Sequence, residues 1–319
     1  FTRQFKRLHR RTRVRCADRS SGGPHSGPYG KLRAIAMFDA DQYQLLDFGG
    51  GRKLERFGAY LLDRYSPPAE DARKSNAAAW KDLHARYERT QGDEGRWKPA
   101  GVLPATWTIS HGECVFELQA TPFGHLGVFP EQAANWDWIA KQIARASRPL
   151  RVLNLFAYTG GSTLATAASG AEVVHVDSAK NTVAWARRNA ELSGLAEKPI
   201  RWIAEDAKRF AERELRRGNR YDAVILDPPS YGHGPKGETW KITRDLHSLL
   251  TTCAALTEGQ RAFMLLTCHS PGFEPPEVEA MLADAVFGTC QAGATAQPLT
   301  VGCVDGRQLP SGVVARWPR

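Results

Sequence analysis

The sequence has few of the features that define metal-ribbon, disulfide-stapled or membrane proteins. Its six cysteines are scattered through 319 residues and form no Cys-x-x-Cys pair, which argues against a zinc ribbon and against a disulfide framework. No apolar run approaches the roughly 20 residues that a membrane span needs, and no secretory apolar segment is visible. We therefore expect a soluble, cytoplasmic protein with no metal site and no membrane contact. The sequence does not indicate an oligomeric state.

The excess of positive charge is confined to one end of the chain. The whole sequence carries 43 Lys and Arg against 34 Asp and Glu, which gives a net charge of +9. Residues 1–33 contain ten of these cations and a single Asp, so the remaining residues carry 33 charges of each sign. The excess therefore predicts a basic tail at 1–33 that is disordered or an incidental extension. An RNA-contacting arm and a targeting peptide are the alternatives.

A strand, a turn and a helix succeed one another in the middle of the chain. The apolar run Arg151–Leu155 predicts a buried parallel strand, and the Ala- and Thr-rich segment Ser162–Ser169 predicts a helix. The turn between them contains Gly160 and Gly161. Because such a turn presents unpaired backbone N–H groups, this arrangement favours a nucleotide-like ligand.

Three more apolar strands follow, and acidic residues come directly after each of them. Asp177 is seventeen positions after Gly160, close to where a Rossmann-type unit places a carboxylate for the hydroxyl groups of a ribose. Parallel strands end at one edge of a sheet, where ligands bind, so we expect a site there. The strands and their acidic residues are Glu172–Val176 with Asp177, Ile200–Ala204 with Glu205 and Asp206, and Tyr221–Leu226 with Asp227.

Residues 34–122 predict a smaller, mostly β accessory domain that precedes a larger domain at 123–319. Alternation in Tyr43–Phe48 indicates a strand, residues 107–118 indicate a hairpin, and Ala77–Tyr87 indicates a helix. Basic side chains lie near aromatic residues in this region, and such a mixture can bind nucleic acid. A solvated face over a small core is an equally good interpretation. The basic residues are Lys53, Arg56 and Arg64.

These features together resemble the class I S-adenosylmethionine-dependent methyltransferases, and among them the large-subunit (23S) ribosomal RNA methyltransferases of the cytosine-5 group. The resemblance rests on the turn Asn154–Gly161, on Asp177 and Asp206, and on Asp227 with the two prolines after it. It covers residues 123–319, which it implies are the cofactor-binding catalytic domain. The accessory part resembles the RNA-binding portion of the same group less closely.

The resemblance also implies an architecture. The larger domain should be an α/β, Rossmann-like sheet of seven strands whose last strand is antiparallel. Leu299–Val304 and Val313–Trp317, which are separated by a turn-like segment, would form the final hairpin.

The cofactor implied is S-adenosylmethionine. Many methyltransferases have three glycines in the turn, whereas this chain has Phe156 and Tyr158 at the first two places and keeps only Gly160. Asp177 would accept hydrogen bonds from the ribose and Asp206 from the adenine amino group; the alternatives are a surface carboxylate and a helix N-cap. The resemblance also places Phe129 or Gln132 at the cofactor. The expected cofactor-binding residues are Gln132, Asn154, Phe156, Ala157, Tyr158, Thr159, Gly160, Asp177, Ser178, Asp206, Ala207 and Asp227.

The most specific motif is Asp227-Pro228-Pro229. Two consecutive prolines cannot continue a central strand, so the chain turns out stiffly and presents Asp227 at the reaction centre. The next strand, Ala262–Leu266, leads to Cys268, where the resemblance assigns a nucleophile whose thiolate adds to C6 of cytosine and makes C5 reactive. A buried free cysteine is the alternative. The expected catalytic residues are Asp227, Pro228 and Cys268.

Two departures from the family pattern concern the target atom. Enzymes that methylate exocyclic amines usually have an aromatic residue directly after the prolines, whereas Ser230 precedes Tyr231 here. The cytosine-5 group often has Ser after its cysteine, whereas this chain has His269. We expect a methyltransferase that acts on a base in RNA, ribosomal RNA in particular, at C5 of cytosine. The alternatives are methylation of an exocyclic amine or of a non-RNA substrate, an NAD-type oxidoreductase, and a non-catalytic RNA-binding relative.

Overall fold

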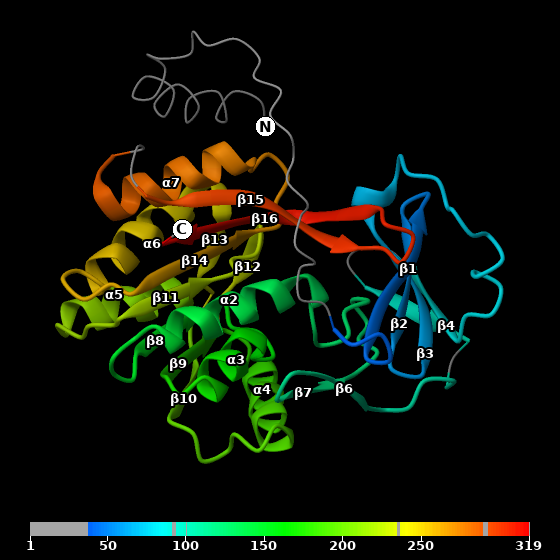
Figure 1. Ribbon diagram of the computed structural model, residues 1–319, viewed down its shortest axis with the longest axis horizontal. Coiled ribbons are helices and arrows are strands. Elements are labelled where there is room, and N and C mark those ends of the chain that lie inside the picture. The colour runs from blue at the N-terminus through cyan, green and yellow to red at the C-terminus, as the bar shows by residue number, and fades with distance from the viewer. Residues whose placement is uncertain (1–37, 91–93, 100, 235–236, 290–292, 319) are drawn as a thin grey trace, which may run out of the picture. The chain divides into compact units, whose positions relative to one another are not determined.

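A seven-stranded sheet forms the framework of the computed structural model (Figure 1). Its strands are β8 (Arg151–Leu155), β9 (Glu172–Asp177), β10 (Ile200–Ala204), β11 (Ala223–Leu226), β14 (Phe263–Cys268), β15 (Thr295–Gly302) and β16 (Gln308–Trp317). In space they follow the order β10-β9-β8-β11-β14-β16-β15. The first five are parallel, and β16 is antiparallel to both of its neighbours. The predicted α/β sheet with an antiparallel last strand is therefore confirmed.

Helices pack against both faces of this sheet because its strands are apolar on both sides. They are α2 (Ala133–Ala144), α3 (Gly161–Ala168), α4 (Lys180–Leu192), α5 (Ala207–Arg216), α6 (Ile242–Leu256) and α7 (Pro275–Phe287). Successive residues of a strand point to opposite faces. Leu153 and Val224 accordingly join one core cluster with α5, α6 and α7, whereas Val152 and Ile225 join another with α2.

The N-terminal part of the described chain is mostly β, as predicted. A five-stranded sheet has the order β1-β2-β3-β4-β5, in which only β3 and β4 pair in parallel. A separate two-stranded hairpin pairs β6 with β7. The boundary between residues 122 and 123 stays a prediction. The strands are β1 (Tyr43–Gly49), β2 (Arg52–Phe57), β3 (Tyr60–Tyr65), β4 (Ala85–Arg89), β5 (Gly95–Lys98), β6 (Trp107–His111) and β7 (Cys114–Leu118).

The helix predicted for Ala77–Tyr87 is wrong. Residues 77–80 form turns, and β4 begins at Ala85. Ala85 and Tyr87 are buried while Arg86 between them is exposed, which is the alternation of a strand. The indole of Trp80 donates to the Asp47 carboxylate at 2.7 Å. A tertiary contact therefore outweighs the helix propensity of the three alanines that precede Trp80.

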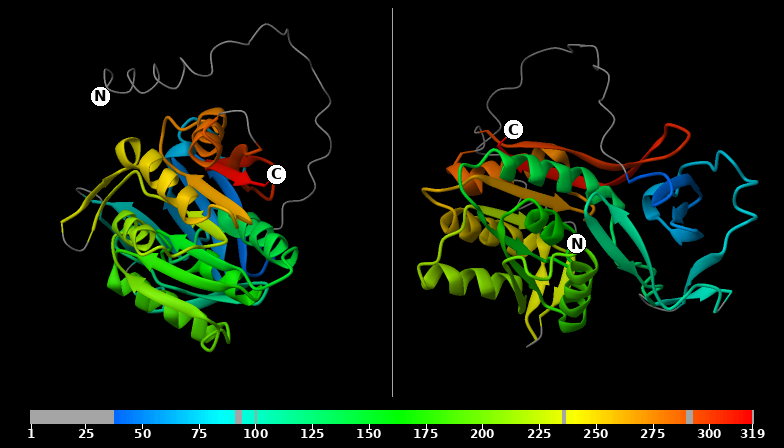
Figure 2. Two further views of the ribbon diagram at one scale, coloured as in Figure 1. Left: turned by 90° about the vertical axis from the view of Figure 1, so that its left-hand side faces the viewer. Right: turned by 60° about the horizontal axis from the view of Figure 1, so that its bottom comes forward.

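The hairpin of β15 and β16 also contacts the accessory sheet. Beyond the end of β15, Cys303 forms a parallel bridge with Leu45 of β1, and the Val304 N–H donates to the Leu45 carbonyl at 3.0 Å. The guanidinium of Arg307 donates to the fully buried carboxylate of Asp47. The hairpin, drawn in red in Figures 1 and 2, therefore belongs to one sheet at its base and binds the other at its tip.

The structure describes residues 38–90, 94–99, 101–234, 237–289 and 293–318. The basic tail predicted at 1–33 lies outside these ranges. Within them, no helix combines the length and the apolar character that crossing a membrane requires. The cysteines in the same ranges are all buried and unbridged; they are Cys114, Cys253, Cys268 and Cys303.

Candidate functional site

A cavity lies where β8 and β11 end. It is lined by residues that follow these strands and by residues of β7, α2 and α3 and of the segment before α2. Seven of the predicted site residues line it together: Gln132, Asn154, Phe156, Ala157, Tyr158, Thr159 and Asp227. Phe129, which the resemblance also indicated, lines it as well. The lining residues that were not predicted are Phe116, Gly127, Val128, Trp136, Gly161 and Ser162.

The turn after β8 has a left-handed backbone at three alternate residues. Phe156, Tyr158 and Gly160 have φ angles of 56°, 49° and 92°. This region of φ favours glycine, because a side chain clashes there with the backbone. The two aromatic residues therefore occupy glycine-like conformations, and their rings are packed: Phe156 lies 4.9 Å from Trp240 and Tyr158 lies 5.3 Å from Phe129, centroid to centroid.

Hydrogen bonds with β9, with α4 and with the segment before α2 hold this turn in place. The Ala157 N–H donates to the carbonyl of Val176 in β9 at 3.0 Å, and the Thr159 hydroxyl donates to the carbonyl of Gly127. The Asn189 side chain, fully buried on α4, donates to the Thr159 carbonyl at 2.9 Å. Sequence reasoning missed Asn189 because it is far along the chain and lies on a helix with no local motif.

Trp136 packs directly on Gly161. A Cβ atom on Gly161 would lie 2.6 Å from Cζ2 of Trp136, so the ring can take this place only beside glycine. The ring also stacks on Phe116, with the two ring centroids 5.1 Å apart. The buried Nε1 of Trp136 has no hydrogen-bond partner among the described residues. A buried donor without an acceptor costs about 1–3 kcal/mol, so an acceptor on a bound ligand would stabilise this arrangement.

Asp177, at the end of β9, accepts hydrogen bonds from two backbone groups. Its oxygens accept from the Tyr158 N–H at 2.9 Å and from the Ala179 N–H at 3.0 Å. Burial raises the pKa of Asp177 above its usual range, and these bonds oppose the rise. Asp177 and its neighbour Ser178 are partly exposed but do not line the cavity. Asp177 therefore contacts the turn that the resemblance assigns to the cofactor.

Asp206 caps helix α5. Its Oδ1 accepts from the Arg209 N–H at 2.9 Å, which is the N-cap alternative considered from the sequence. Ala207, the first residue of the helix, is buried. Neither residue lines the cavity, and neither does Gly160. A role for Asp206 and Ala207 at the adenine of the cofactor stays a prediction.

The carboxylate of Asp227, directly after β11, accepts hydrogen bonds from three side chains. Gln132 Nε2 donates to Oδ2 at 3.1 Å, the Thr267 hydroxyl donates to Oδ1, and His269 Nε2 lies 3.2 Å from Oδ1. Burial opposes ionisation of Asp227, but the charge and hydrogen bond of His269 outweigh it and hold its pKa below the usual range. Pro228, the next residue, is buried and does not line the cavity.

Cys268 ends β14 next to this carboxylate but is covered. It is 1% exposed and does not line the cavity. Burial, and then the negative charge of Asp227, raise the pKa of its thiol to about 12. The structure therefore places a neutral thiol beside the cavity, with the residues before and after it both in contact with Asp227.

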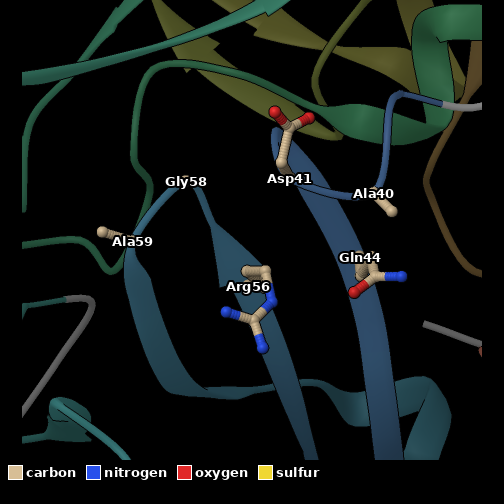
Figure 3. Close-up of a pocket in the computed structure, with 6 residues that line it drawn as sticks. All are labelled: Ala40, Asp41, Gln44, Arg56, Gly58 and Ala59. Atoms are coloured by element: carbon tan, nitrogen blue, oxygen red, sulfur yellow. The ribbon is translucent and has the colours of Figure 1, made fainter.

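The three basic residues predicted to contact nucleic acid have different surroundings. Arg64 and Lys53 both pair with the buried Glu55, at 2.7 Å and 3.2 Å. Arg56 instead lines a surface hollow, where it is paired across the strands with Gln44 (Figure 3). This hollow shares no lining residue with the cavity at the large sheet.

Comparison with curated proteins finds ribosomal RNA enzymes among the relatives. A putative ribosomal RNA large subunit methyltransferase of Methanocaldococcus jannaschii is 32% identical over 210 residues, 62% of this chain and 51% of that protein. The ribosomal RNA large subunit methyltransferase K/L of Hahella chejuensis is 31% identical over 247 residues, 71% of this chain and 32% of that protein. The chain thus spans about half of the first relative and about a third of the second.

A solved structure covers more of the chain, and a family model matches its central part. The crystal structure of the SAM-dependent methyltransferase from Agrobacterium tumefaciens is 36% identical with a TM-score of 0.82, and the match covers 88% of this chain and 91% of that one. The family model described as S-adenosylmethionine-dependent methyltransferase matches residues 71–275. The chain therefore belongs to the S-adenosylmethionine-dependent methyltransferase family.

Proposed function

We propose that this chain binds S-adenosylmethionine in the cavity at the large sheet and transfers its methyl group to a base in RNA, ribosomal RNA in particular. The observation that carries the proposal is that the turn from Phe156 to Thr159 and the carboxylate of Asp227 line one cavity. The turn would bind the methyl donor and Asp227 would face the acceptor. The two curated relatives, both named as ribosomal RNA large subunit methyltransferases, support an RNA substrate.

The residues around the cavity suit the chemical groups of this cofactor. Its sulfonium supplies an electrophilic methyl group, so the protein has mainly to orient an in-line transfer. The unpartnered N–H of Trp136 suits the carboxylate of a methionine moiety. Asp177 accepts hydrogen bonds from the ribose hydroxyls, with Ser178 beside it. Asp206 accepts from the adenine amino group while the backbone of Ala207 donates to the ring.

The substrate must present a single base, because a base that is stacked in a helix cannot reach such a cavity. The direct test is incubation of the protein with labelled cofactor and ribosomal RNA, followed by digestion and mass spectrometry of the nucleosides. We expect one labelled, methylated base. If the protein binds the cofactor but transfers no label to RNA, the proposal of an RNA substrate is contradicted.

The target atom in this proposal is C5 of cytosine, with Cys268 as the nucleophile. The thiolate adds to C6, C5 then takes the methyl group, and loss of the C5 proton releases the thiolate. Because the thiol is covered and neutral in the structure, RNA binding has to expose it and favour its ionisation.

Cys268→Ala tests the covalent route. We expect methyl transfer to fall to background, because no thiolate can activate C5, while binding of S-adenosylhomocysteine measured by calorimetry persists. Cys253→Ala is the matched control, because Cys253 is also fully buried but lies in α6, away from the cavity. Full activity of the Cys268→Ala protein would exclude this route.

One observation favours a second candidate, methylation of an exocyclic amine. Asp227 is held as an ionised carboxylate while Cys268 is a neutral, covered thiol. An ionised carboxylate can accept a hydrogen bond from an amine and needs no covalent step. For this candidate, the Cys268→Ala protein would stay active and the modified nucleoside would carry its methyl group on nitrogen.

A further inference from the structure

The ring of His269 lies between two hydrogen-bond acceptors that come from different strands. Its Nδ1 contacts the backbone carbonyl of Ser311 in β16, and its Nε2 lies 3.2 Å from Oδ1 of Asp227. A carbonyl oxygen and an ionised carboxylate can only accept, so both ring nitrogens have to donate. An imidazole donates from both nitrogens only when it is protonated and positively charged.

The other groups around the ring are consistent with this charge. Gln132 Nε2 lies 3.4 Å from the ring Nε2 but donates to the other oxygen of Asp227. Glu131, in η2 (Pro130–Gln132), adds a second negative charge, and the Cys268 thiol is neutral. Burial disfavours the imidazolium, but Asp227 and Glu131 outweigh it and raise the pKa of His269 to about 9. The side chain is 31% exposed, so solvent can exchange protons with it.

These contacts form a closed circuit of side-chain and backbone groups around the predicted reaction centre. Asp227 binds His269, His269 binds the Ser311 carbonyl, and the Ser311 hydroxyl donates to Glu131 at 2.7 Å. Glu131 adjoins Gln132, which donates back to Asp227. The circuit therefore links the ends of β11 and β14 with β16 and η2.

The backbone of β16 has to lie close to Cys268 and His269 for this circuit to form. A Cβ atom on Gly312, where φ is 138°, would lie 2.4 Å from the Cys268 carbonyl oxygen and 3.0 Å from Nδ1 of His269. Only glycine at this position lets the Ser311 carbonyl reach the histidine. The contact therefore requires His269 after β14 and Gly312 in β16.

We propose that His269 is a positioning residue, an imidazolium that fixes the Asp227 carboxylate beside the acceptor base and joins it to β16. The inference rests on the proposed function, because it assumes that Asp227 acts on the base. At neutral pH this cation keeps Asp227 ionised and in one orientation.

The first test needs no RNA substrate. The chain contains nine histidines, and the signals of His269 in a ¹⁵N-histidine spectrum are identified by their loss in the His269→Asn protein. We expect both ring nitrogens to be protonated at neutral pH, with titration near pH 9. A neutral tautomer at pH 7, or titration near the ordinary value of about 6.5, would overturn the inference.

The second test measures methyl transfer against pH for the wild type and for His269→Asn. In the wild type, kcat should fall as pH rises through about 9, where the imidazolium is lost. In the variant we expect kcat about tenfold or more lower, which is about 1.4 kcal/mol of barrier, with KM for RNA and affinity for S-adenosylhomocysteine little changed.

The variant should also lack the alkaline limb near pH 9, and its acidic limb should move to higher pH because Asp227 has lost a neighbouring cation. His247→Asn, which removes an exposed histidine that pairs with Asp284 at 3.1 Å, is the matched control. An unchanged kcat or an unchanged alkaline limb in His269→Asn would overturn the positioning role. If the wild type itself methylates no RNA, the proposed function fails, and the spectrum still decides the state of His269.

Discussion

Phe156 and Tyr158 have the backbone conformation that glycine usually has, at the centre of the turn after β8. A left-handed conformation costs a residue with a side chain roughly 1–2 kcal/mol. Contacts of the two rings with Trp240 and Phe129 offset this cost. The backbone of the turn therefore has the conformation typical of glycine, while the two aromatic side chains line the cavity.

Asp177→Ala should remove cofactor binding. The carboxylate contacts the turn through the Tyr158 N–H and, in our proposal, accepts hydrogen bonds from two ribose hydroxyls. Loss of hydrogen bonds to a charged group costs about 1.5–3 kcal/mol each, so affinity for S-adenosylhomocysteine should fall by about a hundredfold or more. Calorimetry measures it directly. Glu172→Ala, at the exposed start of the same strand, is the control, and equal affinities for the two variants would contradict the role of Asp177.

Gly161→Ala should displace Trp136 and narrow the cavity. The added methyl group would overlap the indole, and overpacking of this kind costs about 1–3 kcal/mol of folding free energy. We expect a lower Tm and weaker binding of S-adenosylhomocysteine. Gly170→Ala is the control for cofactor affinity, because a Cβ atom there meets nothing within 4 Å; its φ of 91° strains the backbone of the variant, so only its Tm should fall. A Gly161→Ala protein with wild-type cofactor affinity would show that Trp136 does not limit the cavity.

The residues that could be predicted were those at the end of a strand or directly after it. Asn154 and Asp227 line the cavity as expected, because the end of a parallel strand fixes where the next side chains lie. Trp136 and Asn189 could not be predicted in this way, since their place depends on how separate helices pack against the turn. The accessibility of Cys268 also depends on packing by distant elements, which no local motif encodes.

At the level of elements, the contact between the β15–β16 hairpin and β1 depends on one buried carboxylate. Asp47 accepts from Arg307, from the indole of Trp80 at 2.7 Å and from the Ser75 and Asn76 N–H groups at 3.0 and 3.1 Å. Burial opposes its ionisation, but these hydrogen bonds lower its pKa from 3.8 to about 2. Its contribution to folding is therefore complete above about pH 4 and is lost as pH falls towards 2.

Arg307→Ala should loosen the hairpin tip. The variant leaves the buried Asp47 without its cation, at a cost of about 2 kcal/mol in the free energy of unfolding. Urea unfolding at pH 7 measures this loss, and repeating it towards pH 2 should show the difference between wild type and variant shrinking as Asp47 protonates. Arg220→Ala, at an exposed loop position, is the control. A constant difference across this pH range would exclude the Asp47 contact as its cause.

The strands of the large sheet were predictable because each is a short apolar run that ends in a polar residue. The segment Thr239–Lys241 forms a short strand, β13, which pairs with β12 (Tyr231–His233) before α6 begins at Ile242. The helical periodicity of α6 does not by itself show that these three residues form a strand. The same limit explains Ala77–Tyr87, where alanines suggested a helix. The contact of Trp80 with Asp47 and the pairing of β4 with β3 and β5 determined turns and a strand instead.

At the scale of the whole molecule, charge does not by itself identify the substrate, because the residues after 33 carry equal numbers of both signs. Any binding of RNA by the accessory sheet would then depend on local groups. Arg56 lines a surface hollow together with Gln44, whereas Lys53 and Arg64 are paired with Glu55. Arg56 is therefore the best candidate for a phosphate contact among the three.

Arg56→Ala should weaken RNA binding without affecting the cofactor. Each phosphate contact releases counterions, so the slope of log K against log salt should become less steep by about 1. Fluorescence anisotropy with a ribosomal RNA fragment at several salt concentrations measures both affinity and slope. Lys198→Ala, at an exposed position between α4 and β10, is the control. An unchanged slope would place the RNA elsewhere.

Strand β16 lies inside the large sheet, yet it is synthesised after every other described element. Until the residues of β16 are present, β14 has no neighbour on one side and His269 lacks the Ser311 carbonyl. A chain that ended before Gln308 would thus contain the whole turn after β8 but would leave β14 unpaired on that side. Methyl transfer in our proposal therefore depends on β16, although no residue of this strand lines the cavity.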